Sequence, residues 1–116
     1  MKTTLKVASV EDFFSRGVEL AKRADRGESI PCERIIAFEA PEDLARLVTT
    51  AKLVLLREVK ACPGSITDLS QRLHRDRSAV KRDVDALQRV GLLEINTTTG
   101  HAKQVRAVAD QVLLAI

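Results

Sequence analysis

The chain has 116 residues, including 19 Lys and Arg and 16 Asp and Glu, and its formal net charge is +3. This length suits one domain, or a small core with an added arm, and a hydrophobic content of 45% excludes a disordered chain. We expect neither a transmembrane helix nor a secretory signal, because the sequence has no apolar run of about 18 residues and no apolar segment followed by a small-residue cleavage site.

The first 48 residues predict alternating strands and helices. Thr3–Val7 has the composition of a short strand, and the apolar residues of Val10–Arg26 have helical spacing up to a stop signal at Gly27. Glu33–Glu39 has strand-like character, and Pro41 opens a second short helix with acidic residues in its first turn. We expect the aromatic side chains to occupy core positions, namely Phe13, Phe14 and Phe38.

The next segment predicts a helix over Ala51–Ala61. Thr49 or Thr50 supplies its N-cap, and Pro63 follows its end. Its broad apolar face is made by Leu53, Val54, Leu56 and Val59.

Ser65–Arg82 has the layout of a helix-turn-helix. Ser65 caps the first helix, and Asp68 completes a weak capping box. The turn falls at His74–Asp76. The second helix, about Arg77 to Val90, packs through an apolar stripe of Val80, Val84 and Leu87 and ends at Gly91.

The residues after this second helix predict a β-hairpin. Leu92–Ile95 and His101–Val108 are strand-like and flank the polar turn Asn96–Gly100. A helix-turn-helix followed directly by a hairpin is a winged helix. We therefore expect an α+β, mainly α fold, in which residues 49–116 form the winged helix.

The two ends of the chain predict an extension to the winged helix. Gln111–Ile116 is too apolar to stay exposed, so we expect it to pair with Thr3–Val7 or with Glu33–Glu39. Residues 1–48 form a strand-helix-strand-helix extension without a recognisable active site. We expect it to make a homodimer, through Val10–Arg26 and the strands around it, or to bind a partner chain. The alternative is that it only covers the winged helix within a monomer.

Positive charge gathers in the second half of the chain. Residues 1–58 carry ten basic and ten acidic residues, whereas residues 59–116 carry nine and six. Gln71–Arg82 alone holds five basic residues and one acid. This footprint at a helix-turn-helix predicts binding of double-stranded DNA and a role in transcription regulation. Single-stranded or RNA binding is disfavoured, because the chain has no Trp and no Tyr on which bases could stack.

The helix-turn-helix geometry assigns roles to individual side chains. In this geometry the second helix enters the major groove and the first crosses the backbone. Arg77 and Arg82 are candidates for reading guanine, while Lys81 and Arg75 suit phosphate contacts. In the hairpin, Lys103 is the best candidate for a backbone or minor-groove contact. The full candidate set is Ser65, Arg75, Arg77, Ser78, Lys81, Arg82, His101, Lys103 and Arg106.

Each of these cations has a simpler interpretation as solvated surface charge. Arg72 and Arg89 suit solvent or pairing with nearby acids, and Asp83 can pair with a basic side chain that would otherwise reach DNA. The competing function is a winged-helix protein-interaction module that holds a partner through residues 1–48 without binding DNA. An effector-sensing regulator is a third possibility, although no effector pocket is evident in the pattern.

The sequence gives no indication of an enzyme. It has no metal-ligand spacing, no Gly-rich phosphate loop and no nucleophile motif, so we expect no catalytic residues, metal or cofactor. His74 and His101 each stand alone. Cys32 and Cys62 are also isolated, as expected for reduced thiols in a cytoplasmic protein.

Beyond these signals, the chain resembles a family of small predicted transcriptional regulators with a MarR-like winged helix. The resemblance covers nearly the whole chain, through SVEDFF (Ser9–Phe14), IIAFEAPEDLARLVTTAK (Ile35–Lys52) and, most specifically, LSQRLHRDRSAVKRDVDALQRVGLLE (Leu69–Glu94). It implies a DNA-binding repressor. Members look like the DNA-binding halves of toxin–antitoxin operons, so it also implies an autoregulating antitoxin with a toxin protein as partner. Asn96–Ala107 is less basic than the wing of this family. Independently of the resemblance, helix-turn-helix repressors usually dimerise to bind two half-sites, so we expect a dimer.

Overall fold

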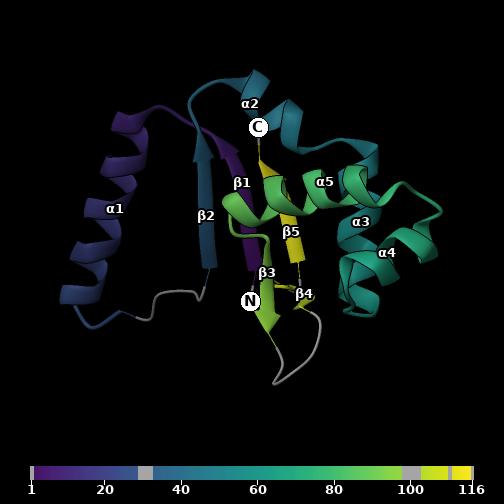
Figure 1. The fold of residues 1–116 in the computed structure, drawn as a ribbon. Helices are drawn as coiled ribbons and strands as arrows, with labels where there is room; N and C mark the ends of the chain where they lie inside the picture. The colour runs from purple at the N-terminus through teal and green to yellow at the C-terminus, as the bar shows by residue number, and fades with distance from the viewer. Residues whose placement is uncertain (1, 29–32, 98–102, 110, 116) are drawn as a thin grey trace. The chain divides into compact units, whose positions relative to one another are not determined.

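The computed structural model describes residues 2–28, 33–97, 103–109 and 111–115. In these residues the elements follow in the order β1, α1, β2, α2, α3, α4, α5, β3, β4, β5 (Figure 1). The expected α+β, mainly α class is confirmed. The chain divides into two compact units, Met1–Ala45 with Gln111–Ile116, and Arg46–Asp110, and it passes from one to the other within α2 (Pro41–Leu47). Within the described ranges, none of the helices has the length and apolarity needed to cross a membrane.

The first unit is built on a three-stranded parallel sheet. β1 (Lys2–Val7) lies in the centre, between β2 (Glu33–Phe38) and β5 (Gln111–Ala115). Thr4 is in register with Ile35 on one side and with Leu113 on the other. The C-terminal strand therefore pairs with the N-terminal strand, which is one of the two pairings expected from the sequence. This pairing brings the two ends of the chain into one sheet.

Helix α1 (Val10–Asp25) follows β1 and begins as its sequence predicts. The Ser9 Oγ accepts a hydrogen bond from the Asp12 N–H at 3.1 Å. No residue of α1 is buried, and the expected core positions of Phe13 and Phe14 are wrong. Helical spacing predicts the apolar stripe of α1 correctly, but it cannot predict whether other residues cover that stripe. At the start of α1, Val10, Phe13 and Phe14 line a hollow of about 250 Å³ together with Ile35 and Ala37 of β2. Phe38 on β2 is partly buried.

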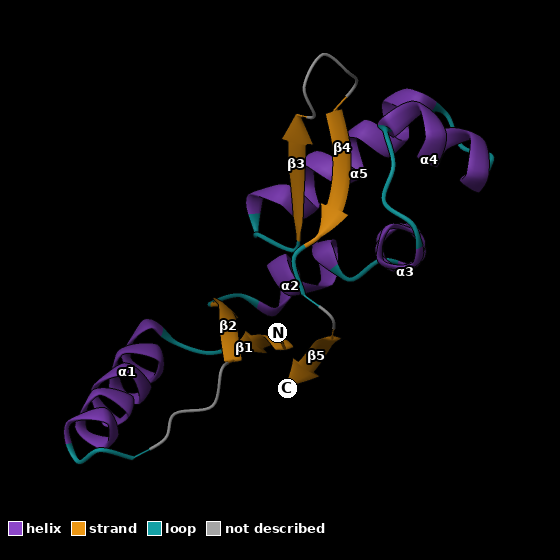
Figure 2. Cartoon of the chain, turned by 90° about the horizontal axis from the view of Figure 1, so that it is seen from below, coloured by secondary structure: helices purple, strands orange, loops and turns teal. Residues whose placement is uncertain are grey.

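The second unit is the expected winged helix. It contains α3 (Thr50–Ala61), α4 (Ile66–Leu73), α5 (Arg77–Arg89) and the antiparallel hairpin of β3 (Leu93–Thr97) and β4 (Lys103–Ala107) (Figure 2). The three helices pack against one another, and the hairpin packs on α5 and α3. Its core is formed by Leu55, Val59, Leu69, Val80, Val84, Leu87, Leu92, Leu93 and Val105.

Helix α3 presents only part of its predicted apolar face to this core, namely Val59 and, partly buried, Leu56. Leu55 and Val59 are fully buried, whereas Leu53 and Val54 remain exposed. Four consecutive apolar residues, Leu53–Leu56, surround most of the helix. Periodicity could not select among them, because each one extends the apolar surface in a different direction.

The expected Gly91 stop fixes the direction in which the hairpin leaves α5. Gly91 has φ +85°, and its N–H donates to the Gln88 carbonyl at 3.0 Å. The Leu92 N–H donates to the Leu87 carbonyl at 2.9 Å, which completes a Schellman motif. A second anchor lies before α4, where Gly64 and Val105 exchange backbone hydrogen bonds across an isolated bridge. Together these contacts place β4 beside the start of α4.

Candidate nucleic-acid interface

The turn between α4 and α5 is held by backbone hydrogen bonds and one carboxylate. His74 has φ 52°, and the Arg75 N–H donates to the Ser70 carbonyl at 3.0 Å. Asp76 then caps α5, because its Oδ2 accepts from the N–H groups of Ser78 and Ala79 at 3.1 and 3.4 Å. The start of α5 is therefore fixed by two sets of contacts, those of the preceding turn and those of the Asp76 cap.

Helix α5 exposes its basic residues on two adjacent rows. Val80, Val84 and Leu87 are fully buried, so they define the inner side of the helix. At roughly 100° per residue, Ser78 and Arg82 lie on the opposite, outer side. Arg77 and Lys81, one helical turn apart, lie on one flank between these two sides. All four of these side chains are exposed.

A cleft runs between this flank, the start of α4 and the hairpin. Its volume is about 360 Å³. Three cations and two hydroxyl groups line it together with apolar side chains, namely Ser65, Ile66, Thr67, Arg77, Lys81, Ile95, Lys103 and Val105. Among the residues that the structure describes, no carboxylate belongs to this lining. The cleft is therefore suited to a negatively charged, hydrogen-bond-accepting ligand such as a phosphate chain.

Two of the cleft cations already have partners within the protein. The Arg77 Nε donates to the Thr67 Oγ1 at 3.1 Å, which leaves the terminal guanidinium nitrogens of Arg77 available to a ligand. The Lys81 Nζ contacts the Asp85 Oδ2 at 3.2 Å, one turn along the helix. This pair is exposed and worth little, so a phosphate can replace Asp85 as the partner of Lys81 at small cost.

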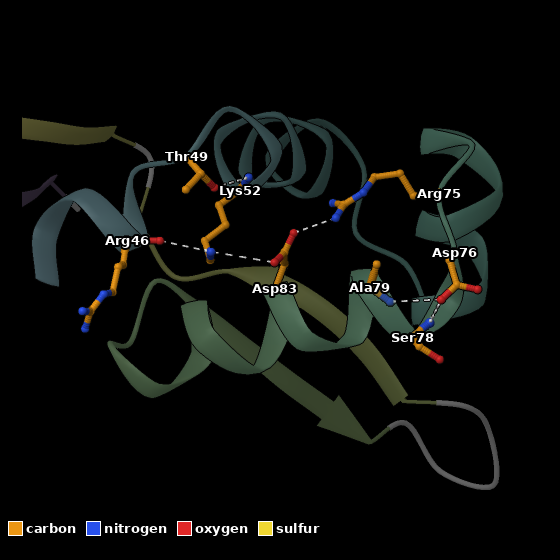
Figure 3. Close-up of polar contacts among 8 residues, drawn as sticks. All are labelled: Arg46, Thr49, Lys52, Arg75, Asp76, Ser78, Ala79 and Asp83. Carbon is orange, nitrogen blue, oxygen red and sulfur yellow. Dashed lines mark hydrogen bonds and ion pairs between the residues drawn. The ribbon is translucent and has the colours of Figure 1, made fainter. Parts of the chain in front are cut away.

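Arg75 instead belongs to a network of ion pairs centred on Asp83 of α5. Figure 3 shows Asp83 between two cations, with its Oδ2 at 2.8 Å from the Arg75 Nη2 and its Oδ1 at 3.8 Å from the Lys52 Nζ. The Lys52 Nζ also donates to the Arg46 carbonyl at 3.1 Å. These groups are largely shielded from solvent. The network therefore ties the turn and α3 to α5, and Arg75 is a positioning residue in this structure.

A profile of the HVO_A0114 family matches residues 47–114, which is more than half of the chain. The chain belongs to the HVO_A0114 family. The matched segment includes every candidate DNA-binding residue predicted from the sequence. No curated protein matches the sequence significantly.

Solved structures share the fold of this HVO_A0114 member. An ArsR-like transcriptional regulator from Rhodococcus sp. RHA1 is 29% identical, with a TM-score of 0.52 over 56% of this chain and 60% of that chain. HlyU from Vibrio cholerae N16961 is 20% identical, with a TM-score of 0.50 over 60% and 76%. YusO from Bacillus subtilis is 17% identical, with a TM-score of 0.51 over 87% and 69%.

These comparisons confirm the resemblance to small winged-helix regulators that the sequence predicted. The chain spans less than two thirds of the length of the Rhodococcus regulator. Within the HVO_A0114 segment, the structure gathers four of the nine candidate residues in the cleft, namely Ser65, Arg77, Lys81 and Lys103.

The other candidates lie elsewhere. Ser78 and Arg82 occupy the outer side of α5, and Arg75 faces Asp83. Arg106 is exposed and lies opposite Glu94 in the hairpin register. His101 falls outside the described residues. Arg72 is paired, as the sequence suggested, with its Nη1 at 3.2 Å from the Glu58 Oε1.

Sequence reasoning missed Thr67 and Ile95 as parts of the cleft. Thr67 lies in the first turn of α4, two residues after the Ser65 cap, where a hydroxyl group has access to a ligand at the helix start. This position of Thr67 near the N-terminus of a helix could have indicated a ligand contact from the sequence alone. Ile95 gave none, because an apolar strand residue is normally assigned to the core. In the described part of the chain, no three His, Cys, Asp or Glu side chains come together as metal ligands would.

Proposed function

We propose that the chain is a sequence-specific regulator of transcription that binds double-stranded DNA, and not an enzyme. The observation that carries this proposal is the cleft, in which Arg77, Lys81 and Lys103 converge from α5 and the hairpin with no acid among the described lining residues. The 29% identical ArsR-like transcriptional regulator supports the same assignment.

The geometry assigns different DNA contacts to the two rows of α5 and to the hairpin. Lys81 and Lys103, point charges in the cleft, suit phosphate oxygens and fix the register of the protein on DNA. Arg82, on the outer side of α5, and the terminal nitrogens of Arg77 suit bidentate contacts with guanine in the major groove. The Ser65 and Thr67 hydroxyl groups add neutral hydrogen bonds to the backbone.

We further propose that the regulator is a homodimer that represses its own promoter. One helix-turn-helix reads only a half-site, and two copies related by a two-fold axis read two half-sites about 34 Å apart. The resemblance to antitoxin-like regulators supports autoregulation. A bound dimer would then exclude the transcription machinery from the promoter.

The test is a titration of the protein against its own upstream promoter duplex and a scrambled duplex of the same length. We expect preferential binding to the promoter. Substituting Arg77→Ala and Arg82→Ala together should reduce this preference by about tenfold or more, because each lost bidentate contact costs about 1–3 kcal/mol. Arg89→Ala, at the far end of α5, is the matched control and should keep the preference. Unchanged preference in the double variant would contradict the assignment of α5 as the reading helix.

A second candidate function is the binding of a partner protein, such as a toxin, without DNA. The exposed apolar residues of α1 favour it, because soluble proteins rarely leave such a stripe uncovered. Co-expression of the chain with the product of the neighbouring gene tests it. A stable heterocomplex together with equal or absent binding to both duplexes would favour this second function.

A further inference from the structure

The least explained surface of the molecule is the apolar stripe of α1. Val10, Phe13, Phe14 and Val18 are 49%, 48%, 65% and 55% exposed. The two phenylalanines alone leave on the order of 200 Å² of aromatic surface in contact with water. A stripe of this kind on a soluble helix marks an interaction surface.

The stripe is bulky in its first half and small in its second half. Val10, Phe14 and Val18 recur at four-residue spacing along one side of the helix. Gly17, Ala21 and Ala24 continue the same side toward the end of α1. A Cβ added at Gly17 would meet nothing within 4 Å, so the space beside this position is open.

This asymmetry makes α1 complementary to an antiparallel copy of itself. If two α1 helices cross near residues 17 and 18, Phe14 of one copy lies opposite Ala21 of the other, and Val18 lies opposite Gly17. Large side chains then fill the space left by small ones, which allows helix axes to approach to about 8–10 Å. In a parallel pair the bulky halves would meet each other instead.

The charges beside the stripe favour the same arrangement. Glu11 in the first turn and Lys22 in the last turn lie on one flank, about 16 Å apart along the helix, too far for a contact within one copy. In an antiparallel pair related by a two-fold axis, this flank faces its own copy. With the crossing near residues 17 and 18, Glu11 of each copy lies level with Ala24 of the other, about 3 Å along the axis from Lys22. The two long side chains can span this offset, which gives two ion pairs for each dimer.

We infer that α1 forms the dimer interface, called here the dimer seam. In it, α1 packs antiparallel against α1 of a second copy of this chain through the Val10–Phe14–Val18 stripe. The inference deepens the proposed function, because it names the surface by which two half-site readers associate. The occupant is a second copy, since both the alternation of size and the charges on the flank are self-complementary.

The test reverses one charge of each ion pair. In an antiparallel homodimer each single reversal should weaken association, and a mixture of the two reversed variants should restore it. Glu11→Lys alone places two lysines against each other at both ends of the seam, and Lys22→Glu alone places two glutamates there. Each single variant should weaken the dimer by about tenfold, because it replaces two attractions by two repulsions. An equimolar mixture of the two variants should restore wild-type association, since each copy then meets its opposite charge.

The measurement is molar mass by light scattering over a concentration series, with helix content by circular dichroism to verify folding. Phe14→Glu should give a monomer, whereas Arg16→Glu, a reversal on the outer side of α1, should leave the dimer intact. A monomeric wild-type protein, a dimeric Phe14→Glu variant, or a mixture no better than its components would overturn the inference.

A half-site duplex separates this inference from the proposed function. Monomeric Phe14→Glu should bind a single half-site as the wild type does, but lose the cooperative gain on a full promoter. If the wild type forms the dimer as described and binds no duplex, the proposed function fails and the seam stands.

Discussion

At the scale of single residues, three helix ends share one backbone geometry but not one residue type. Gly27 and Gly91 close α1 and α5 at φ +78° and +85°, whereas His74 closes α4 at φ 52°. The two glycines were predictable from the sequence because glycine is the usual residue there. His74 was predicted only as part of a turn, because a histidine in a sequence does not indicate a left-handed backbone conformation.

His74 should therefore be a position where substitution raises stability. We expect His74→Gly to increase the free energy of unfolding by up to about 1 kcal/mol, because a left-handed backbone strains any residue that has a Cβ. His74→Val should lower it by about 1 kcal/mol or more, since a branched Cβ worsens the strain. Urea denaturation measures both. A destabilised glycine variant would show that the histidine side chain makes a contribution larger than the strain.

Asp76 should matter for stability more than an equally charged residue further along the same helix. Its carboxylate accepts from two N–H groups of the first turn of α5. Asp76→Ala should lower the free energy of unfolding by about 1 kcal/mol, as expected for a lost N-cap. Asp85→Ala is the matched control, since it removes only the exposed pair with Lys81. Equal costs for the two substitutions in thermal unfolding would argue against a capping role.

At the scale of elements, Asp83 links the turn and α3 to α5. Asp83→Asn removes the charge that both Arg75 and Lys52 face in a partly buried site, so we expect a loss of about 1–2 kcal/mol of stability. Asp85→Asn should cost less than half of this. The comparison is made by urea denaturation at low and high salt. If high salt removes the whole difference, the network is only a surface ion pair.

The elements themselves could largely be predicted from the sequence, because their signals are local. The Ser65–Asp68 capping box and the Val80–Val84–Leu87 stripe both lie within a few turns of the helices they define, and the structure has both. The partner of each surface could not be predicted. Burial of Leu55 instead of Leu53 depends on residues distant in sequence. The same holds for the presence of Lys103 and Arg77 in the lining of one cleft.

At the scale of the whole molecule, we propose that the winged-helix unit binds DNA and that the unit built on β1, β2 and β5 serves association. The first and last strands join in one sheet, so truncation of β5 should disturb the unit that carries α1 without removing any cleft residue. We therefore expect a chain ending at Asp110 to lose dimerisation but to keep weak, salt-sensitive binding to a half-site duplex. Light scattering and fluorescence anisotropy measure the two properties separately. Loss of half-site binding in a folded truncated chain would contradict this division.

We propose that the cleft of the winged helix holds the DNA backbone. The most direct test of this proposal is the salt dependence of duplex affinity for the wild type and for the Lys81→Ala, Lys103→Ala double variant. Each phosphate neutralised contributes about −0.9 to the slope of log K against log salt concentration, so removing both lysines should make the slope shallower by about 1.8 for each bound copy. Lys60→Ala with Arg89→Ala, which removes two cations outside the cleft, should leave the slope unchanged. The same slope for the cleft variant and the wild type would show that the cleft lysines do not contact DNA phosphates.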